Sequence, residues 1–243
     1  MADSQAAPQY KYFRTGSAND VAAKTEAGFA LMGGGKDLDV AFRWMCQRAG
    51  GGDFLVLRAS GEDDYNPYIQ PLCKLNSVAT LILPNREAAI DPFAAETVAH
   101  AEAILIAGGD QANYIRFWMG TPVQAAINMA IQHGVPVGGT SAGLAVMGEW
   151  AYSAEGDKPD EKNLDAKTAL MDPTGPRVTL VHGFLEIPAL KGIITDSHFV
   201  KRDRMGRLLA FLARLNGSRR LLRGGSSQIR GDGYLLDSGD HNL

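Results

Sequence analysis

The sequence predicts an α/β domain built on a mostly parallel β-sheet with helices on both faces. Three observations lead to this fold class. The chain has 243 residues, which suits one domain with a large core. Short, continuous apolar runs are typical of strands buried on both faces, and amphipathic segments of helical period separate them. Ligands of such sheets bind beyond the carboxyl ends of the strands, so functional residues are expected there.

The first part of the domain contains four strands and four helices. The strands are short, mainly apolar runs, expected at residues 29–32, 54–57, 78–83 and 103–107. The helices have apolar residues at helical spacing and are expected at residues 38–48, 92–101, 111–118 and 122–132. Thr121 is a suitable N-cap for the last of these, because Pro122 fits the first helical position.

The second part continues the alternation of strands and helices. A short strand at residues 135–138 leads into Thr140 and Ser141, and a helix-like segment follows at once. Further strands are expected at residues 178–181 and 192–195, and a long helix at residues 199–215. Three regions result: an N-terminal arm at 1–26, an α/β domain at 27–215 and an atypical C-terminal tail at 216–243, which is polar and Gly-rich and is expected to pack weakly.

Charge and hydropathy exclude some classes of partner. The net charge of −3 gives no reason to expect a nucleic acid or an anionic membrane surface. No apolar run reaches the roughly 20 residues that a membrane-spanning helix needs. The N-terminus has neither a charged n-region nor an apolar h-region, so the sequence as given indicates a cytoplasmic protein. An exported mature form and a homodimer both stay open.

The chain has two cysteines, too few for a disulfide framework. Cys46 and Cys73 both stand among apolar residues at helix-like positions. We therefore expect buried free thiols, since unpaired cysteine behaves as a small hydrophobic residue. A single disulfide in an exported protein is the alternative.

The pattern G-x-S-x-G stands at residues 139–143, between a predicted strand and a predicted helix. This is the setting of a nucleophile elbow, in which a strained turn exposes a serine hydroxyl at the edge of the sheet. Gly139 and Gly143 allow the strand and the helix to approach closely. The Ala142 amide, at the start of the helix, is then free to donate to an oxyanion. Ser141 is therefore a candidate nucleophile.

A nucleophilic serine needs a base, and the chain offers five histidines. His198 follows the predicted strand 192–195, which places it at the same edge of the sheet as Ser141. The other four stand at helix ends, after a strand or in the tail, namely His100, His133, His182 and His241. His198 is thus the best candidate base, although a lone histidine at a strand end often has only a structural role.

Four motifs resemble one known family. They are MGGG at 32–35, AGGDQ at 107–111, GGTSAG at 138–143 and DSHFVKRDRMGRL at 196–208. Together they look like the cyanophycinase-like branch of a serine peptidase family that also includes aspartyl dipeptidases. The resemblance implies a class I glutamine amidotransferase-like fold, a flavodoxin-like three-layer architecture, with serine in place of the cysteine nucleophile. It also implies hydrolysis of β-aspartyl peptide links, in cyanophycin or in β-Asp-Arg-like peptides.

The matching motif positions imply a role for each residue. Ser141 would be the nucleophile and His198 the base, and Gly109 and Ala142 would supply oxyanion amides. The substrate site would be lined by Gln111, Asp196, Arg202, Arg204 and Arg207. The residues themselves agree in part, because arginines just after the base can form forked hydrogen bonds to a carboxylate substrate. The alternative is an ordinary charged, solvated helix face.

The sequence departs from the family pattern at two places. Ser197 stands where many cyanophycinases have glutamine before the histidine. In the family this neighbour lies in the binding pocket, so the difference argues against the polymer cyanophycin as the substrate. Relatives also continue after the long helix with a Gly-rich strand that carries an Asp-Glu pair, and residues 216–243 show no such element.

For the acid of the triad we favour Glu155, with Asp157 and Asp160 as alternatives in the same surface loop.

The expected function is therefore a serine-type, cyanophycinase-like exopeptidase that acts through a Ser-His-acid triad and an acyl-enzyme. It requires neither a cofactor nor a metal, and no cluster with metal-ligand spacing stands in the sequence. Two other readings remain. One is a catalytically inactive homologue that binds peptides, and the other is an esterase on an α/β-hydrolase scaffold, which shares the elbow and the Ser-acid-His order.

Overall fold

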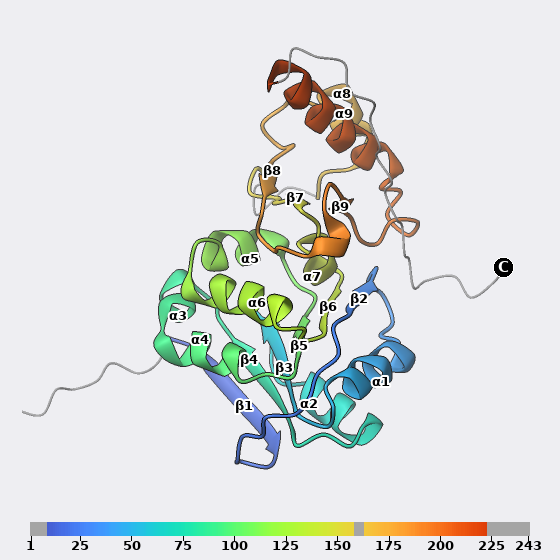
Figure 1. Ribbon diagram of the computed structural model, residues 1–243. Coiled ribbons are helices and arrows are strands. Elements are labelled where there is room, and N and C mark those ends of the chain that lie inside the picture. The colour runs from blue at the N-terminus through green and yellow to red at the C-terminus, as the bar shows by residue number, and fades with distance from the viewer. Residues whose placement is uncertain (1–8, 158–162, 223–243) are drawn as a thin grey trace, which may run out of the picture.

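A computed structural model describes residues 9–157 and 163–222 of the chain, with the backbone alone at residues 217–222. These residues form two sheets. A six-stranded sheet with its helices makes up the lower part of Figure 1, and a three-stranded sheet with two helices makes up the upper part. The candidate residues Ser141 and His198 lie where the two parts meet.

The large sheet has the strand order β1-β4-β3-β5-β6-β2. Five of its strands are parallel to one another, and these are β2 (Phe29–Met32), β3 (Asp53–Arg58), β4 (Ser77–Ile82), β5 (Ala103–Ile106) and β6 (Val137–Thr140). The predicted α/β class with a mostly parallel sheet is therefore confirmed. The predicted strand at 135–138 forms two residues later, because Pro136 precedes it.

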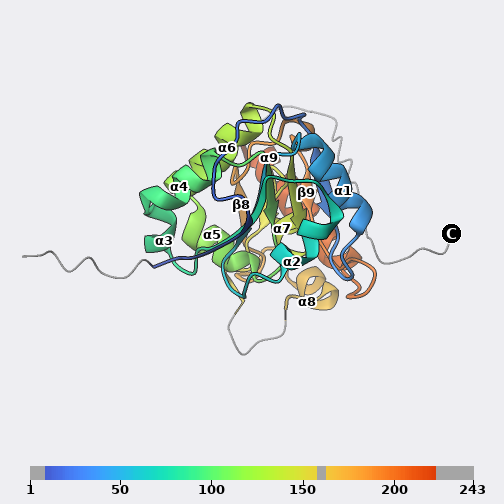
Figure 2. The same ribbon diagram turned by 90° about the horizontal axis from the view of Figure 1, so that it is seen from below.

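Apolar side chains cover both faces of this sheet. Along β3, Leu55 and Leu57 belong to one core cluster, whereas Phe54 and Val56 belong to another on the opposite face. The alternation follows from the strand period of two residues. The first face is covered by α3 (Arg86–Ile90), α4 (Pro92–Ala99), α5 (Gln111–Trp118) and α6 (Pro122–Gln132). The second is covered by α1 (Asp39–Arg48), α2 (Tyr65–Ile69) and the 3₁₀ turn Gln70–Leu72. Figure 2 shows the three layers.

The edge strand β1 (Lys11–Gly16) is antiparallel to β4, with Lys11 opposite Ile82 and Gly16 opposite Ser77. It lies inside the predicted arm 1–26, so a part of that arm is an integral strand of the sheet. The sequence did not reveal it because its side chains are exposed or half-buried and form no apolar run. A strand at a sheet edge needs only one partner and can tolerate such a composition.

The smaller sheet has the order β8-β7-β9. β7 (Trp150–Tyr152) is antiparallel to β8 (Leu180–His182) and parallel to β9 (Ile194–Thr195). Its core includes Tyr152 and Phe211, whose rings stack at 4.8 Å. The helices of this part are α8 (Ala166–Met171) and α9 (Met205–Leu222), with a 3₁₀ turn at Pro188–Leu190.

The last helix, α9, begins later than predicted. The expected helix started at residue 199, but residues 199–203 form turns, and Asp203 has a left-handed backbone with φ 47°. A left-handed residue cannot belong to a right-handed helix, so α9 starts beyond it. At its other end α9 continues to Leu222, which extends into the predicted tail. The rest of that tail, 223–243, lies outside the described residues.

The two cysteines form a disulfide, so the expectation of free thiols was wrong. Cys46 in α1 and Cys73 after the 3₁₀ turn are 27 residues apart in sequence, and their Cα atoms are 6.1 Å apart. That separation lies within the range that a disulfide can bridge. Only the packing of the 3₁₀ turn against α1 brings the two sulfurs together, and no sequence pattern encodes it.

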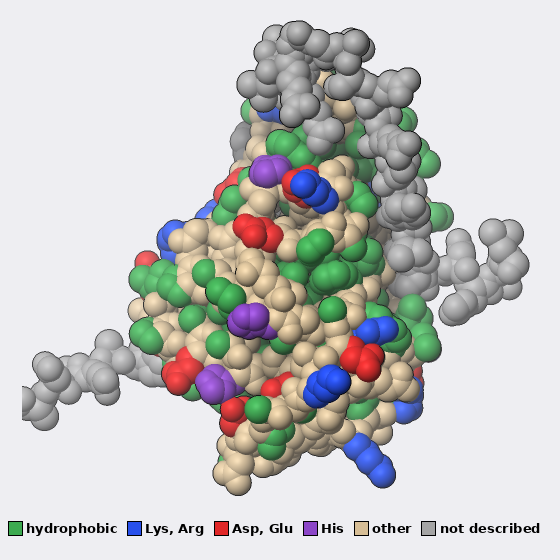
Figure 3. Space-filling view, in the orientation of Figure 1, with side chains coloured by type: hydrophobic (Ala, Val, Ile, Leu, Met, Phe, Trp, Pro, Cys, Tyr) green, Lys and Arg blue, Asp and Glu red, His purple; other side chains and the backbone are tan. Residues whose placement is uncertain are grey.

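Acidic and basic side chains are interspersed on the face of the molecule shown in Figure 3, over the lower part of the fold. This mixture agrees with the small net charge of −3. None of the described helices combines the length and the apolar character that crossing a membrane would require.

Candidate active site

Ser141 lies between the last residue of β6 and the first residue of α7 (Ala142–Ala145). Its backbone has φ 53° and ψ −115°, a strained conformation for a residue with a side chain. The Ser141 amide donates to Met32 O at 3.1 Å, which ties the turn to the neighbouring strand β2. Ser141 therefore occupies a sharp turn that joins a strand directly to a helix.

The positions of Gly139 and Gly143, on either side of Ser141, have no room for a side chain. A Cβ atom on Gly143 would collide with Ile106 O in β5. A Cβ atom on Gly139 would lie 2.6 Å from the Gly143 backbone. Strand β6 and helix α7 can therefore pack around the turn only if both positions lack a side chain.

His198 reaches the same point from the other part of the fold. It follows β9, and its Nε2 lies 2.8 Å from Ser141 Oγ. Its backbone also has a positive φ, 49°, and its amide donates to Gly33 O at 2.7 Å. Two residues 57 positions apart in sequence thus form a hydrogen-bonded pair of hydroxyl and imidazole.

Gly34 completes this arrangement, and sequence reasoning gave it no role. A Cβ atom on Gly34 would lie 2.6 Å from His198 Nε2 and 3.0 Å from Ser141 Cβ. The loop after β2 therefore packs directly on the Ser-His pair. The MGGG motif at 32–35 was the signal that could have identified it.

The pair opens into a cavity of about 610 Å³. Six residues expected from the sequence line it, namely Gly109, Gln111, Ser141, His198, Arg202 and Arg204. Other residues that line the cavity were not identified from the sequence. They are Asp110, Ala112, Asn113, Arg116, Ala154 and Asn163. Asp157 and Ser197, which were considered in other roles, also line it. Gln111 is fixed at the wall because its Nε2 donates to Tyr152 O at 3.2 Å.

Asp196 and Arg207 were expected to contact substrate, but the structure buries them behind the cavity. Each side chain is 1% exposed. Arg207 donates to both carboxylate oxygens of Asp196, through Nε at 2.7 Å and through NH2 at 2.5 Å. This bidentate pair joins α9 to the segment that carries His198, so both residues support that segment rather than face the cavity.

Arg204 connects this buried pair to the cavity. Its NH1 donates to Ser197 O at 2.8 Å and lies 3.4 Å from Asp196 Oδ1. Burial and the neighbouring Arg207 lower the pKa of Arg204 to about 10, so the guanidinium remains charged at neutral pH. Arg202 lines the cavity from an exposed position in the turn before α9.

The three candidates for the triad acid differ in position. Glu155 is exposed, and Ala154 and Asp157, rather than Glu155, form the cavity wall in this part of the described chain. Asp157 accepts from Arg177 Nε at 2.8 Å and from the Tyr152 hydroxyl at 3.0 Å. Asp160 lies outside the described residues.

Chemically, the site combines a hydroxyl next to an imidazole with a cavity rich in arginine. Such a pair can activate the hydroxyl as a nucleophile, and the arginines suit an anionic substrate. Within the described ranges, His, Cys, Asp and Glu side chains nowhere gather in groups of three that could hold a metal ion.

Comparison with known proteins gives one family. Residues 65–171 match the description "Peptidase family S51", a span that includes Ser141 and ends before His198. A cyanophycinase from Geminocystis herdmanii is 36% identical over 121 residues, which cover 49% of this chain and 38% of that protein. A cyanophycinase from Synechococcus elongatus is 26% identical over 179 residues, which cover 69% of this chain and 50% of that protein. The chain thus spans half or less of these curated relatives.

A solved structure is similar in fold. The crystal structure of a peptidase from an acI-B1 Actinobacterium superposes with a TM-score of 0.53 and 17% identity, covering 78% of this chain and 77% of that one. At this identity the likeness concerns the fold, and it agrees with the predicted α/β architecture. The family match and the curated relatives together confirm the predicted resemblance to cyanophycinase-like peptidases.

Proposed function

We propose that this chain, with its resemblance to cyanophycinase-like peptidases, is a serine-type exopeptidase that hydrolyses β-aspartyl peptide links. The substrate would be cyanophycin or a β-Asp-Arg-like peptide. The observation that carries the proposal is the 2.8 Å contact between Ser141 Oγ and His198 Nε2 at the wall of the arginine-rich cavity.

In the first half of the reaction, Ser141 Oγ attacks the carbonyl carbon of the scissile amide while His198 Nε2 accepts the hydroxyl proton. The tetrahedral intermediate carries its negative charge on the former carbonyl oxygen. The Gly109 and Ala142 amides would donate to this oxyanion, since Gly109 lines the cavity beside Ser141 and Ala142 begins α7. Collapse of the intermediate breaks the C–N bond, and the imidazolium returns its proton to the leaving amine.

In the second half, water attacks the resulting acyl-enzyme ester and His198 accepts the proton of the water. The second tetrahedral intermediate collapses, the C–O bond to Ser141 breaks, and the proton returns to the serine oxygen. The products are an aspartyl carboxylate and a free amine. One imidazole carries every proton in turn, as acceptor in one step and as donor in the next.

The charges of the cavity support an anionic substrate. Arg116, Arg202 and Arg204 line it, and a β-aspartyl peptide presents a free α-carboxylate next to the scissile bond. Asp110 and Asp157 line the same space and could receive the cationic side chain of an arginine leaving group. Asp110 also caps α5 through Ala112 N at 2.9 Å, so its carboxylate is held in place.

The test is an assay of amine release from three peptides, β-Asp-Arg, β-Asp-Leu and α-Asp-Leu, and of acid release from a short-chain ester. We expect hydrolysis of the two β-aspartyl peptides. Ser141→Ala should lower it by about 10⁴-fold or more, as removal of a catalytic serine does elsewhere. Exposed Ser60, which does not line the cavity, provides the control Ser60→Ala, expected to act as wild type.

Two results would contradict the proposal. Hydrolysis of the ester alone would identify an esterase instead. Folded protein that binds β-Asp-Arg but releases no amine would identify a binding protein without catalysis.

A further inference from the structure

A second cavity lies far from Ser141, under α4 at the amino ends of β3 and β4. Ser141 follows the carboxyl end of parallel β6, so the two cavities occupy opposite edges of the sheet. The second cavity has a volume of about 350 Å³, enough for a small organic molecule. It is independent of the proposed peptidase activity.

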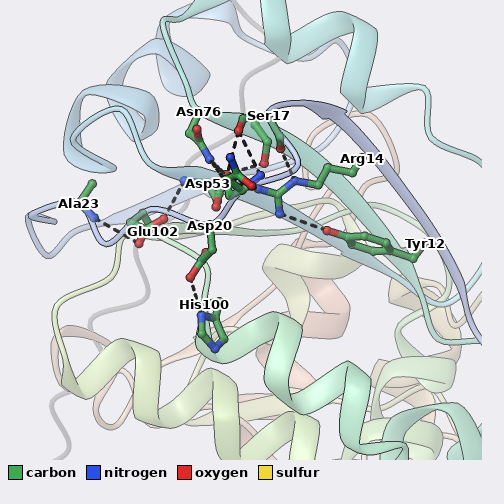
Figure 4. Close-up of polar contacts among 11 residues, drawn as sticks. Tyr12, Arg14, Ser17, Asp20, Ala23, Asp53, Asn76, His100 and Glu102 are labelled. Atoms are coloured by element: carbon green, nitrogen blue, oxygen red, sulfur yellow. Dashed lines mark hydrogen bonds and ion pairs between the residues drawn. The ribbon is translucent and has the colours of Figure 1, made fainter.

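Asp53, the first residue of β3, provides the central observation. Its Oδ1 accepts three hydrogen bonds, from Arg14 NH2 at 3.0 Å, Asn76 Nδ2 at 2.8 Å and Ser77 Oγ at 2.6 Å. Its Oδ2 is buried and has no hydrogen-bond partner, and the side chain is only 8% exposed. Figure 4 shows Asp53 at the centre of the cluster, where Arg14 and Asn76 converge on it.

A buried carboxylate oxygen without a donor is costly and rare in folded proteins. Asp53 also lines the cavity. A ligand that places an N–H group at this end of the cavity would supply the missing donor. The first requirement for the ligand is therefore a hydrogen-bond donor.

The charges around the cavity determine the sign of the ligand. Three carboxylates line it, those of Asp20, Asp53 and Glu96, against the single guanidinium of Arg14 and the imidazole of His100. His100 is already engaged, because its Nδ1 lies 2.7 Å from Asp20 Oδ2, and Figure 4 shows Asp20 between His100 and Asp53. The hydrogen bond with His100 lowers the pKa of Asp20, so this carboxylate stays ionised.

Arg14 balances only one of these three carboxylates, because it pairs with Asp53 at 3.0 Å. Besides Asp53, its guanidinium donates to Ser17 O at 2.7 Å and to Asn19 O at 3.3 Å. Glu96 is exposed on α4, lines the cavity and makes no ion pair with any described residue. The cavity therefore keeps an excess of negative charge, which favours a cation.

The remaining wall is apolar. The rings of Tyr12 and Phe93 meet edge to face at 5.2 Å, and Leu55 and Ala79 come from the sheet. Aromatic faces attract cations and also pack against hydrocarbon. The ligand thus needs a charged head and an apolar body.

We propose that this cavity binds a small organic cation, a primary amine or a guanidinium on a short apolar stem. Its N–H groups donate toward Asp53 Oδ2, Glu96 supplies a counter-charge, and the stem packs against the apolar wall that Tyr12 and Phe93 help to form. The cation could be a free metabolite or the side chain of a lysine or arginine in a peptide, since both present the same group.

The test is calorimetric titration of the full chain with benzylamine and butylguanidine, and with benzyl alcohol as the neutral analogue. We expect saturable one-to-one binding of both cations, and binding of benzyl alcohol weaker by about tenfold or more, because an ionised donor to a carboxylate is worth about that factor. A parallel titration with N-acetylarginine amide separates the two sources: tighter binding of it than of butylguanidine assigns the site to a peptide side chain, and weaker binding assigns it to a free cation.

Variants locate the binding. Asp53→Asn and Glu96→Gln should each weaken benzylamine binding by about tenfold. Glu87→Gln, on the neighbouring helix α3 and outside the cavity, and Ser141→Ala, at the other edge of the sheet, should leave it unchanged. If Asp53→Asn unfolds the chain, the variant Glu96→Gln still tests the proposal, because Glu96 is exposed and its substitution should leave the fold intact. No saturable binding, equal binding of benzyl alcohol, or unchanged affinity in Glu96→Gln would overturn the proposal.

Discussion

Gly34 lies directly against the imidazole of His198. A Cβ atom at this position would stand 2.6 Å from His198 Nε2, and the glycine has φ +93°. The loop after β2 and the segment after β9 therefore meet at the Ser-His pair with no room for even one methyl group.

Substitution of Gly34 should test whether this contact holds the imidazole in place. Gly34→Ala must push His198 away from Ser141 Oγ, and a displacement of about 1 Å can lower a catalytic rate by about 10²-fold. We expect kcat/KM for β-Asp-Arg to fall by that factor. Gly35→Ala is the matched control, because Gly35 also has a positive φ, +109°, but no atom within 4 Å of its Cβ position. An equal loss in both variants would mean that backbone strain alone is responsible.

The position of Glu155 leads to a prediction about the orienting acid. Glu155 is exposed, and substitutions of exposed residues usually change free energies by about 0.5 kcal/mol or less. We expect Glu155→Gln to change kcat/KM by less than about threefold. Asp157→Asn should cost more, because Asp157 lines the cavity and holds Arg177 and the Tyr152 hydroxyl. A large loss in Glu155→Gln alone would establish it as the acid that orients His198.

The buried pair of Asp196 and Arg207 should contribute to stability. Asp196→Asn leaves a buried guanidinium without its counter-charge, which costs about 3–5 kcal/mol of unfolding free energy. Denaturant titration measures this loss. Glu62→Gln removes the exposed pair with Lys11 and should change stability by at most about 1 kcal/mol. Equal effects of the two substitutions would show that burial of the Asp196 pair is not decisive.

The contribution of the Cys46–Cys73 disulfide to the free energy of unfolding should also be measurable. Closing a loop between residues 27 positions apart restricts the unfolded chain and is worth about 3–4 kcal/mol. We expect the double variant Cys46→Ala, Cys73→Ala to lose this amount of stability. Dithiothreitol should lower the melting temperature of the wild type and leave that of the double variant unchanged. Two reactive thiols in unreduced, unfolded protein would refute the bond.

Much of the fold could be predicted because it depends on local pattern. The continuous apolar runs of β3, β4 and β5 identify strands buried on both faces, and the small residues around Ser141 identify a tight strand-to-helix turn. These signals are contained in a few consecutive residues. His198 was expected near Ser141 because its strand was taken as part of the same parallel sheet. That premise was wrong, since β9 belongs to the three-stranded sheet, and the meeting of the two parts of the fold brings His198 to Ser141.

Other features depend on residues that are distant in sequence. β1 is a strand because β4 offers it an unpaired edge, and Cys46 meets Cys73 because the 3₁₀ turn packs on α1. The sequence placed Asp196 and Arg207 near His198, but only the fold shows that their charges satisfy each other inside the protein rather than in the cavity. The guanidinium of an arginine presents two parallel N–H donors, and these fit a substrate carboxylate and a buried aspartate equally well. Local sequence thus determined which residues are candidates for the chemistry. Tertiary packing, through the low exposure and the bidentate geometry of the Asp196–Arg207 pair, decided which of them line the cavity.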